Sequence, residues 1–154
     1  MRYQVMMLNV HEELRHTLMN RFSKMDVNFI MALTMQDAMR LYTEQSFHLL
    51  VLQFSDFTLC SEFFLALRHI NFVPAIALID KYDVENACDV LKAGADLCID
   101  ARWPIDLSVD HIMAQFRRYT SYNQTESHKG RDAANSYLSF FCPSNPSAQV
   151  EIFY

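Results

Sequence analysis

Gln53 is the residue whose position bears most directly on chemistry. It lies near the end of the apolar run Phe47 to Phe54, and Ser55 and Asp56 follow that run. A short apolar run bounded by turn residues predicts a strand buried on both faces of a parallel sheet. Open parallel sheets bind their ligands at the carboxyl ends of the strands, so we expect Gln53 at such a site. Its neutral amide can donate and accept hydrogen bonds, but it is not a carboxylate nucleophile.

Five ionisable residues follow predicted strand ends and should lie near the same rim: His11, Glu12, Asp56, Asp80 and Asp100. His11 with acidic neighbours could bind a transition metal. A single histidine on a loop is far more often solvated than a ligand, so we predict no metal site.

The cysteines show no spacing typical of a metal or redox site. Cys60, Cys88, Cys98 and Cys142 form no Cys-x-x-Cys pair, and three of them fall in apolar periodic segments. We therefore predict reduced cysteines that act as small apolar core residues in a cytoplasmic protein.

Composition excludes several classes of function. With 51% hydrophobic and 20% charged residues, the 154-residue chain is typical of one globular domain. Only two glycines are present, which argues against a glycine-rich phosphate loop, and we predict no cofactor. The net charge of −5 argues against non-specific nucleic-acid binding. No apolar segment is long enough to span a membrane, and the first residues lack the layout of a signal peptide.

The elements that would position these residues alternate along the chain. Apolar runs predict strands at Tyr3–Leu8, Val27–Leu33, Phe47–Phe54, Ala75–Ile79 and Leu97–Asp100. Helical periodicity predicts helices from Glu12 to about Met25, and at Met35–Glu44, Glu62–Ile70, Val84–Ala93 and Pro104–Tyr119. Thr34 with Asp37 resembles a capping box, and Gly94 is typical of a helix C-cap.

This alternation predicts an α/β fold, a doubly wound (βα)5 flavodoxin-like parallel sheet in the order 2-1-3-4-5. We expect residues 1–120 to form this domain. Residues 121–154 show neither a helical nor a hairpin pattern, so we predict a poorly ordered C-terminal tail. Its aromatic residues Phe140, Phe141 and Phe153 could pack on the domain or on a partner, or have no specific role.

Two local phrases, in this order of elements, resemble the receiver domain of bacterial response regulators, the CheY-like family. Lys92-Ala93-Gly94-Ala95-Asp96 looks like the family's phrase before the fifth strand. Phe116-Arg117-Arg118-Tyr119 resembles the end of the last helix in regulators that carry a winged-helix DNA-binding domain. The resemblance covers roughly Tyr3 to Tyr119.

The resemblance implies phosphoryl transfer to an aspartate at the end of the third strand. Carried over by position, the residues of that chemistry are all replaced: the acidic pair by Asn9 and Val10, the phosphoacceptor by Gln53, the hydroxyl residue by Ile79 and the lysine by Ala101. An amide cannot form an acyl phosphate, and Mg²⁺ prefers anionic oxygens. The resemblance therefore implies a degenerate, non-phosphorylatable pseudo-receiver and not an enzyme. Phosphorylation at a displaced acid such as Asp56 stays open.

The family's usual output is protein contact, so we expect a homodimer through the fourth helix, fifth strand and fifth helix. The charged residues expected on that face are Asp89, Lys92, Asp96, Asp110, Arg117 and Arg118. We expect a role in signal transduction or transcriptional regulation without a DNA-binding domain in this chain, because the tail lacks a basic recognition helix. A different class, a small-ligand sensor, stays open: the altered rim could form a hollow lined by Asn9, Gln53, Ile79 and Trp103.

Overall fold

The computed structural model describes residues 2–129, and side chains within residues 2–121. In this range the strands are β1 Tyr3–Leu8, β2 Val27–Ala32, β3 Leu49–Phe54, β4 Ala75–Ile79 and β5 Leu97–Asp100. The helices are α1 Glu12–Arg21, α2 Met35–Glu44, α3 Phe57–Arg68, α4 Val84–Ala93 and α5 Ile105–Lys129. All pairings are parallel and the order is β2-β1-β3-β4-β5, which confirms the predicted doubly wound sheet.

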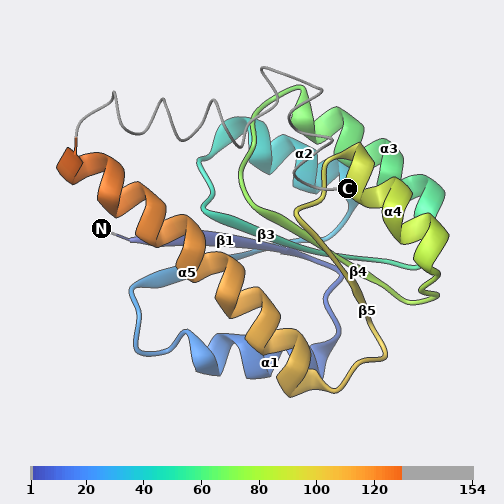
Figure 1. Cartoon of the computed structure of the whole chain (residues 1–154), viewed down its shortest axis with the longest axis horizontal. Coiled ribbons are helices and arrows are strands. Elements are labelled where there is room, and N and C mark those ends of the chain that lie inside the picture. The colour runs from blue at the N-terminus through green and yellow to red at the C-terminus, as the bar shows by residue number, and fades with distance from the viewer. Residues whose placement is uncertain (1, 130–154) are drawn as a thin grey trace. The chain divides into compact units, whose positions relative to one another are not determined.

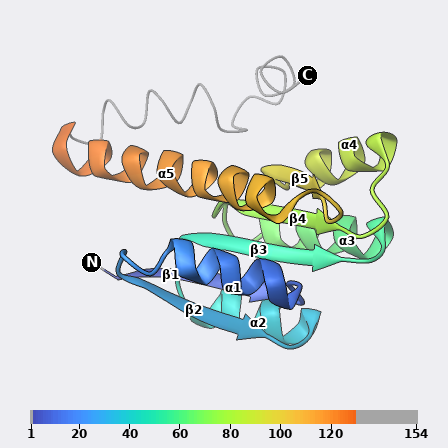
Figure 2. The ribbon, with the colours of Figure 1, turned by 90° about the horizontal axis from the view of Figure 1, so that it is seen from below.

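Two units divide the chain, Met1–Phe116 and Arg117–Tyr154, and the sheet lies in the first. In that unit α1 and the beginning of α5 cover one face of the sheet, while α2, α3 and α4 cover the other (Figures 1 and 2). Successive strand residues point to opposite faces, so each face buries its own cluster. The crossovers thus leave the carboxyl ends of β1, β3, β4 and β5 along one edge of the sheet.

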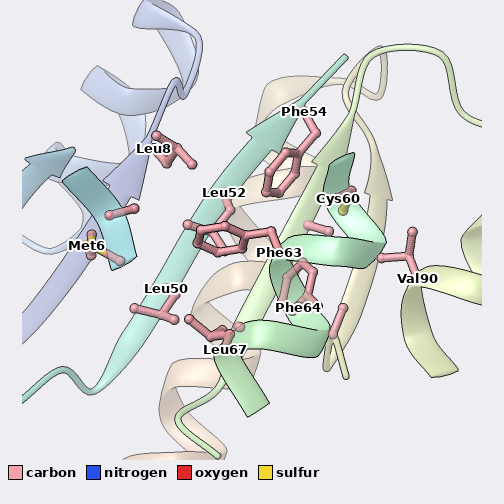
Figure 3. Packing of buried hydrophobic residues seen from close by; sticks show 14 of the residues in the cluster. Met6, Leu8, Leu50, Leu52, Phe54, Cys60, Phe63, Phe64, Leu67 and Val90 are labelled. Atoms are coloured by element: carbon pink, nitrogen blue, oxygen red, sulfur yellow. The ribbon is translucent and has the colours of Figure 1, made fainter. Parts of the chain in front are cut away.

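The larger cluster lies under α3. Phe63, Phe64 and Leu67 pack from α3 onto Leu52 and Phe54 of β3, as Figure 3 shows. Their spacing is the helical spacing of one apolar face, and burial of such side chains contributes about 1.5–3 kcal/mol each. This packing fixes the end of β3 and therefore the position of Gln53.

Helices α2 and α4 have the predicted bounds because strong local signals delimit them. The Thr34 hydroxyl accepts a hydrogen bond from the Asp37 N–H (3.0 Å), and the Asp37 carboxylate accepts one from the Leu33 N–H (3.1 Å). These two bonds satisfy backbone donors at the start of α2. At the end of α4, Gly94 has a φ of 129°, as expected for a glycine C-cap.

Several predicted boundaries were wrong, among them the start of β3, which is Leu49 and not Phe47, and the end of α3, which is Arg68 and not Ile70. Helix α1 ends at Arg21, so Met25 is exposed rather than on its buried face. Helix α3 begins at Phe57 and not at Glu62, because Asp56 caps it by accepting a hydrogen bond from the Thr58 N–H (2.7 Å). Leu33 lies outside β2 and is exposed.

The prediction for the last helix also needs correction, because α5 continues past Tyr119 to Lys129. Residues 120–129 contain neither glycine nor proline, and adding residues to an existing helix is easier than nucleating one. The predicted tail therefore cannot begin at 121. Its remaining part, residues 130–154 with Cys142 and the aromatic residues, lies outside the described residues.

The cysteine prediction holds for two side chains. Cys60 and Cys98 are buried free thiols, whereas Cys88 is free but exposed on α4, outside the core. Burial raises the pKa of the Cys98 thiol to about 12, which keeps it protonated. Across the described part of the chain, no helix combines the length and the apolarity needed to cross a membrane.

Candidate functional site

Gln53 joins two loops at the carboxyl edge of the sheet. Its Oε1 accepts a hydrogen bond from the backbone N–H of His11 (2.9 Å), and its Nε2 donates one to Oδ1 of Asp80 (2.7 Å). The two partners fix the orientation of the amide, because a backbone N–H only donates and a carboxylate only accepts. Because β3 lies between β1 and β4, its side chain can reach the loops that follow both.

Asn9 and Val10, the predicted rim residues after β1, differ in the direction of their side chains. Asn9 is exposed and has a positive φ of 53°, a conformation that asparagine tolerates better than most residues. Val10 turns inward and is buried against α1 and α5. The loop therefore presents one neutral amide and an apolar side chain where the resemblance requires two carboxylates.

The structure separates Ile79 from the other predicted site residues. Ile79 is fully buried in the cluster under α3 and α4, on the face of the sheet away from α1. Ala101 packs instead on the α1 and α5 side, and its backbone N–H donates to the Ile79 carbonyl (2.9 Å). Neither side chain offers a polar group to the rim.

The cation next to Ala101 is already paired. Arg102 donates from its guanidinium to both carboxylate oxygens of Asp100 (3.1 and 3.0 Å), and its backbone N–H adds a third bond (2.9 Å). This guanidinium lowers the pKa of Asp100. The charge of Arg102 is thus largely compensated at its own loop and does not replace the missing lysine.

A hollow of about 340 Å³ lies beside this rim, between the start of α1 and the β5–α5 loop. Its lining includes Gln53, Asp80, Ala101, Arg102, Trp103 and Ser108. Gln53 and Trp103 lie where the sensor hypothesis expected them, whereas Asn9 and Ile79 do not belong to the lining. Within the described residues, no group of three or more His, Cys, Asp or Glu side chains is arranged to hold a metal ion.

Two residues predicted on the dimer face are held by intramolecular ion pairs. Asp96 pairs with Arg68 of α3 (2.9 Å) and accepts from the Ala75 N–H (2.8 Å). Asp110 pairs with Arg21 of α1 (3.0 Å). Asp89 and Lys92 are exposed on α4, and Arg117 and Arg118 are exposed in the second unit.

The phrase from Lys92 to Asp96 has a structural basis. The Arg68 side chain is only 10% exposed and donates to the carbonyls of Gly94 (2.8 Å) and Val73 (2.8 Å). A Cβ on Gly94 would lie 2.4 Å from Cγ of Arg68, so this position needs glycine for space as well as for its φ. The segment from Lys92 to Asp96 thus supplies contacts that hold the Arg68 side chain, away from the rim.

Sequence reasoning missed the partners of Gln53 and the buried Ser108. His11 and Asp80 were placed near the rim, but their bonds to Gln53 span 42 and 27 residues of sequence. Each of the two residues follows a predicted strand end, and this position was the one feature of the sequence that placed them near Gln53. Ser108, on the buried side of α5, gave no signal because a serine in an amphipathic helix is common.

Compared by sequence, the chain matches no protein-family model and no curated protein. Compared by structure, it is similar to a response regulator from Thermotoga maritima, with 16% identity, a TM-score of 0.65, and 76% of this chain and 99% of that chain covered. A Francisella response regulator receiver domain has 17% identity and a TM-score of 0.59, with 76% and 98% covered. The signal receiver domain of a putative Luxo repressor protein from Vibrio parahaemolyticus has 13% identity and a TM-score of 0.64, with 85% and 100% covered. At these identities the comparison shows the fold, which is that of receiver domains.

Proposed function

We propose that this receiver-fold chain is a signalling module that accepts no phosphoryl group at Gln53 and acts through protein contact, in the cytoplasm. One observation carries the proposal: both polar atoms of the Gln53 side chain are used in a bridge between two loops. A side chain in that role stabilises the rim, and it has no carboxylate with which to attack phosphorus.

The surrounding residues support the same conclusion. Phosphoryl transfer depends on positioned charge, with a metal ion and a cation compensating the charge of the transferred group. Asn9 offers one neutral oxygen, Val10 and Ile79 are buried apolar residues, and Ala101 has no charge. Arg102, the neighbouring cation, is held by Asp100.

The alternative acceptor, Asp56, is engaged elsewhere. Its carboxylate accepts the Thr58 N–H at the first turn of α3, which is a capping role. Only Oδ1 accepts this bond, so phosphorylation at Oδ2 of Asp56 stays chemically open. We do not propose Asp56 as the acceptor, and the experiment below includes phosphorylation of Asp56 as one of its outcomes.

For the output we propose a homodimer through α4, β5 and the beginning of α5. Asp89 and Lys92 present charges of both signs on α4, which suits a self-complementary contact. Each of the two helices also exposes a leucine, Leu91 on α4 and Leu107 on α5. Apolar burial would supply affinity, whereas exposed ion pairs contribute only about 0–1 kcal/mol and set geometry.

The test is incubation of the full chain with acetyl phosphate and Mg²⁺, followed by intact mass measurement. The expected result is no phosphoryl adduct, with or without Mg²⁺. A matched variant, Asp56→Asn, identifies the acceptor if an adduct forms. An adduct that is absent in Asp56→Asn would overturn the proposal in favour of the displaced acceptor, and any other adduct on an aspartate would overturn it as well.

A further inference from the structure

The hollow beside Gln53 combines apolar walls with an aromatic side chain. Leu14, Ala101 and Ile105 line it, and Trp103 of the β5–α5 loop completes the wall. The Trp103 ring is half-buried and packs against the His111 ring at a centroid separation of 5.4 Å, which limits its movement. A volume of about 340 Å³ lies at the lower end of the range of small-molecule sites.

The charge of the hollow is negative. Glu13 and Asp80 line it, and neither forms an ion pair with another described side chain. Arg102 also lines it, but its guanidinium is compensated by Asp100. Gln53 uses one oxygen of Asp80, Oδ1, and leaves the other oxygen available to a ligand. An anion would therefore meet two carboxylates, whereas a cation would be attracted.

A hydroxyl group is also available in the hollow. Ser108 is 3% exposed and lines the hollow from α5. Its backbone N–H donates to the Pro104 carbonyl (3.2 Å). Its hydroxyl oxygen is not sealed inside the protein, because among the described residues the buried side-chain atom that lacks a partner is Oε1 of Gln4. The Ser108 hydroxyl can therefore bond to a ligand or a water molecule that occupies the hollow.

We propose that this hollow binds a small organic cation, a primary ammonium on an apolar or aromatic body. The ammonium would lie between the carboxylate of Asp80 and the hydroxyl of Ser108, and the body would lie against Trp103. The proposal rests on the proposed function in one respect only: the rim must be free of a phosphoryl group. It extends that function by giving the altered rim a ligand of its own.

The test uses the full chain and the fluorescence of Trp103, which is the only tryptophan in the sequence. Four probes are titrated: 2-phenylethylamine and n-butylamine as cations, 2-phenylethanol as the neutral analogue and phenylacetate as the anion. We expect a saturable change with 2-phenylethylamine, with about tenfold weaker binding of 2-phenylethanol because the charge interaction is lost. Phenylacetate should bind more weakly still.

Two variants locate the site. Asp80→Asn removes the charge but keeps an acceptor for Gln53, and it should weaken 2-phenylethylamine binding about tenfold. Ser108→Ala should weaken it about fivefold by removing one hydrogen bond. The control Glu62→Gln removes one carboxylate from the exposed side of α3, on the opposite face of the sheet, and should leave binding unchanged.

The proposal is overturned if neither cation gives a saturable change, if phenylacetate binds as tightly as the amine, or if Asp80→Asn binds the amine like the unmodified chain. The probe comparison on the unmodified chain decides the matter even if a variant fails to fold. A phosphoryl adduct in the mass experiment combined with normal amine binding would remove the proposed function and leave the amine site. If no adduct forms and no amine binds, the amine site is refuted and the proposed function stands.

Discussion

The side-chain amide of Gln53 donates a hydrogen bond to the Asp80 carboxylate across 2.7 Å, from the end of β3 to the loop after β4. The same amide accepts the His11 N–H from the loop after β1. An amide can donate to a carboxylate and accept from a backbone N–H at once without carrying a charge. The residue at which we propose that no phosphoryl group is accepted therefore also stabilises the rim.

Replacing Gln53 by glutamate should destabilise the fold. Gln53→Glu exchanges the donor to Asp80 for a second carboxylate, so the two groups repel, and we expect a loss of about 1–3 kcal/mol in the free energy of unfolding at pH 7. Urea denaturation at pH 7 measures the difference in the free energy of unfolding between the variant and the unmodified chain.

Two controls accompany that measurement. Gln53→Met removes both hydrogen bonds without adding charge, so it separates the loss of the bridge from the repulsion between two carboxylates. Gln36→Glu makes the same change at an exposed position of α2 and should alter stability by no more than about 0.5 kcal/mol. Equal stability of Gln53→Glu and the unmodified chain at pH 7 would contradict the bridge.

Gly94 should tolerate no side chain. Gly94→Ala forces a non-glycine residue to a φ of 129° and brings its Cβ to 2.4 Å from Cγ of Arg68, so we expect a loss of roughly 1–3 kcal/mol. Asparagine often relieves strain at positive φ, but Gly94→Asn should be no more stable than Gly94→Ala because the Arg68 stem occupies the space. A clearly more stable Gly94→Asn, measured by urea denaturation, would show that space is not limiting.

Stability should fall in mild acid because of His48. Burial lowers the pKa of His48 below its ordinary value of 6.5, and its Nδ1 accepts a hydrogen bond from the Gln4 N–H (3.0 Å). The unfolded chain therefore binds a proton at this histidine more readily than the folded chain, and stability is lost as pH falls from about 6.5 through the folded pKa.

The measurement is thermal unfolding between about pH 7.5 and pH 5, in steps of about half a pH unit. His48→Asn keeps an acceptor for Gln4 but cannot titrate in this range, so its stability should fall less than that of the unmodified chain. His16→Gln shows what loss of an exposed histidine does by itself. Parallel pH profiles for the unmodified chain and His48→Asn would refute the assignment.

The proposed dimer should depend on Leu91. Leu91→Glu places a charge among the apolar contacts of α4, and we expect at least roughly a tenfold weaker dimer in sedimentation velocity across a concentration series. Leu65 of α3 is even more exposed, at 55% against 39%, so Leu65→Glu is a matched control outside the proposed face. A chain that stays monomeric at all concentrations, or an equal effect of both variants, would contradict this interface.

Local signals explain which parts of the fold could be predicted. Helices α2 and α4 were delimited in advance because Thr34, Asp37 and Gly94 are capping residues whose chemistry acts within a few positions. The start of α3 was missed although Asp56 is a good N-cap residue, because it was interpreted as a rim residue. The end of α5 was missed because polar residues without periodicity can still extend an established helix.

The site was predictable only by position. The apolar run that precedes Ser55 placed Gln53 near the end of β3, but nothing local indicated that its amide bonds to Asp80 and His11. The ion pairs of Asp96 and Asp110 could not be predicted for the same reason, because their arginine partners lie 28 and 89 residues away in sequence. Pairings of this kind arise from tertiary structure, which places distant loops and helices together.

The Gln53 bridge also bears on how this rim could change over generations. A substitution that places an acid at position 53 would remove the donor to Asp80 and add a like charge beside it, while Asn9, Val10 and Ala101 would still supply neither a metal-binding acid nor a cation. An acid at this position alone would therefore lower stability without any gain in chemistry.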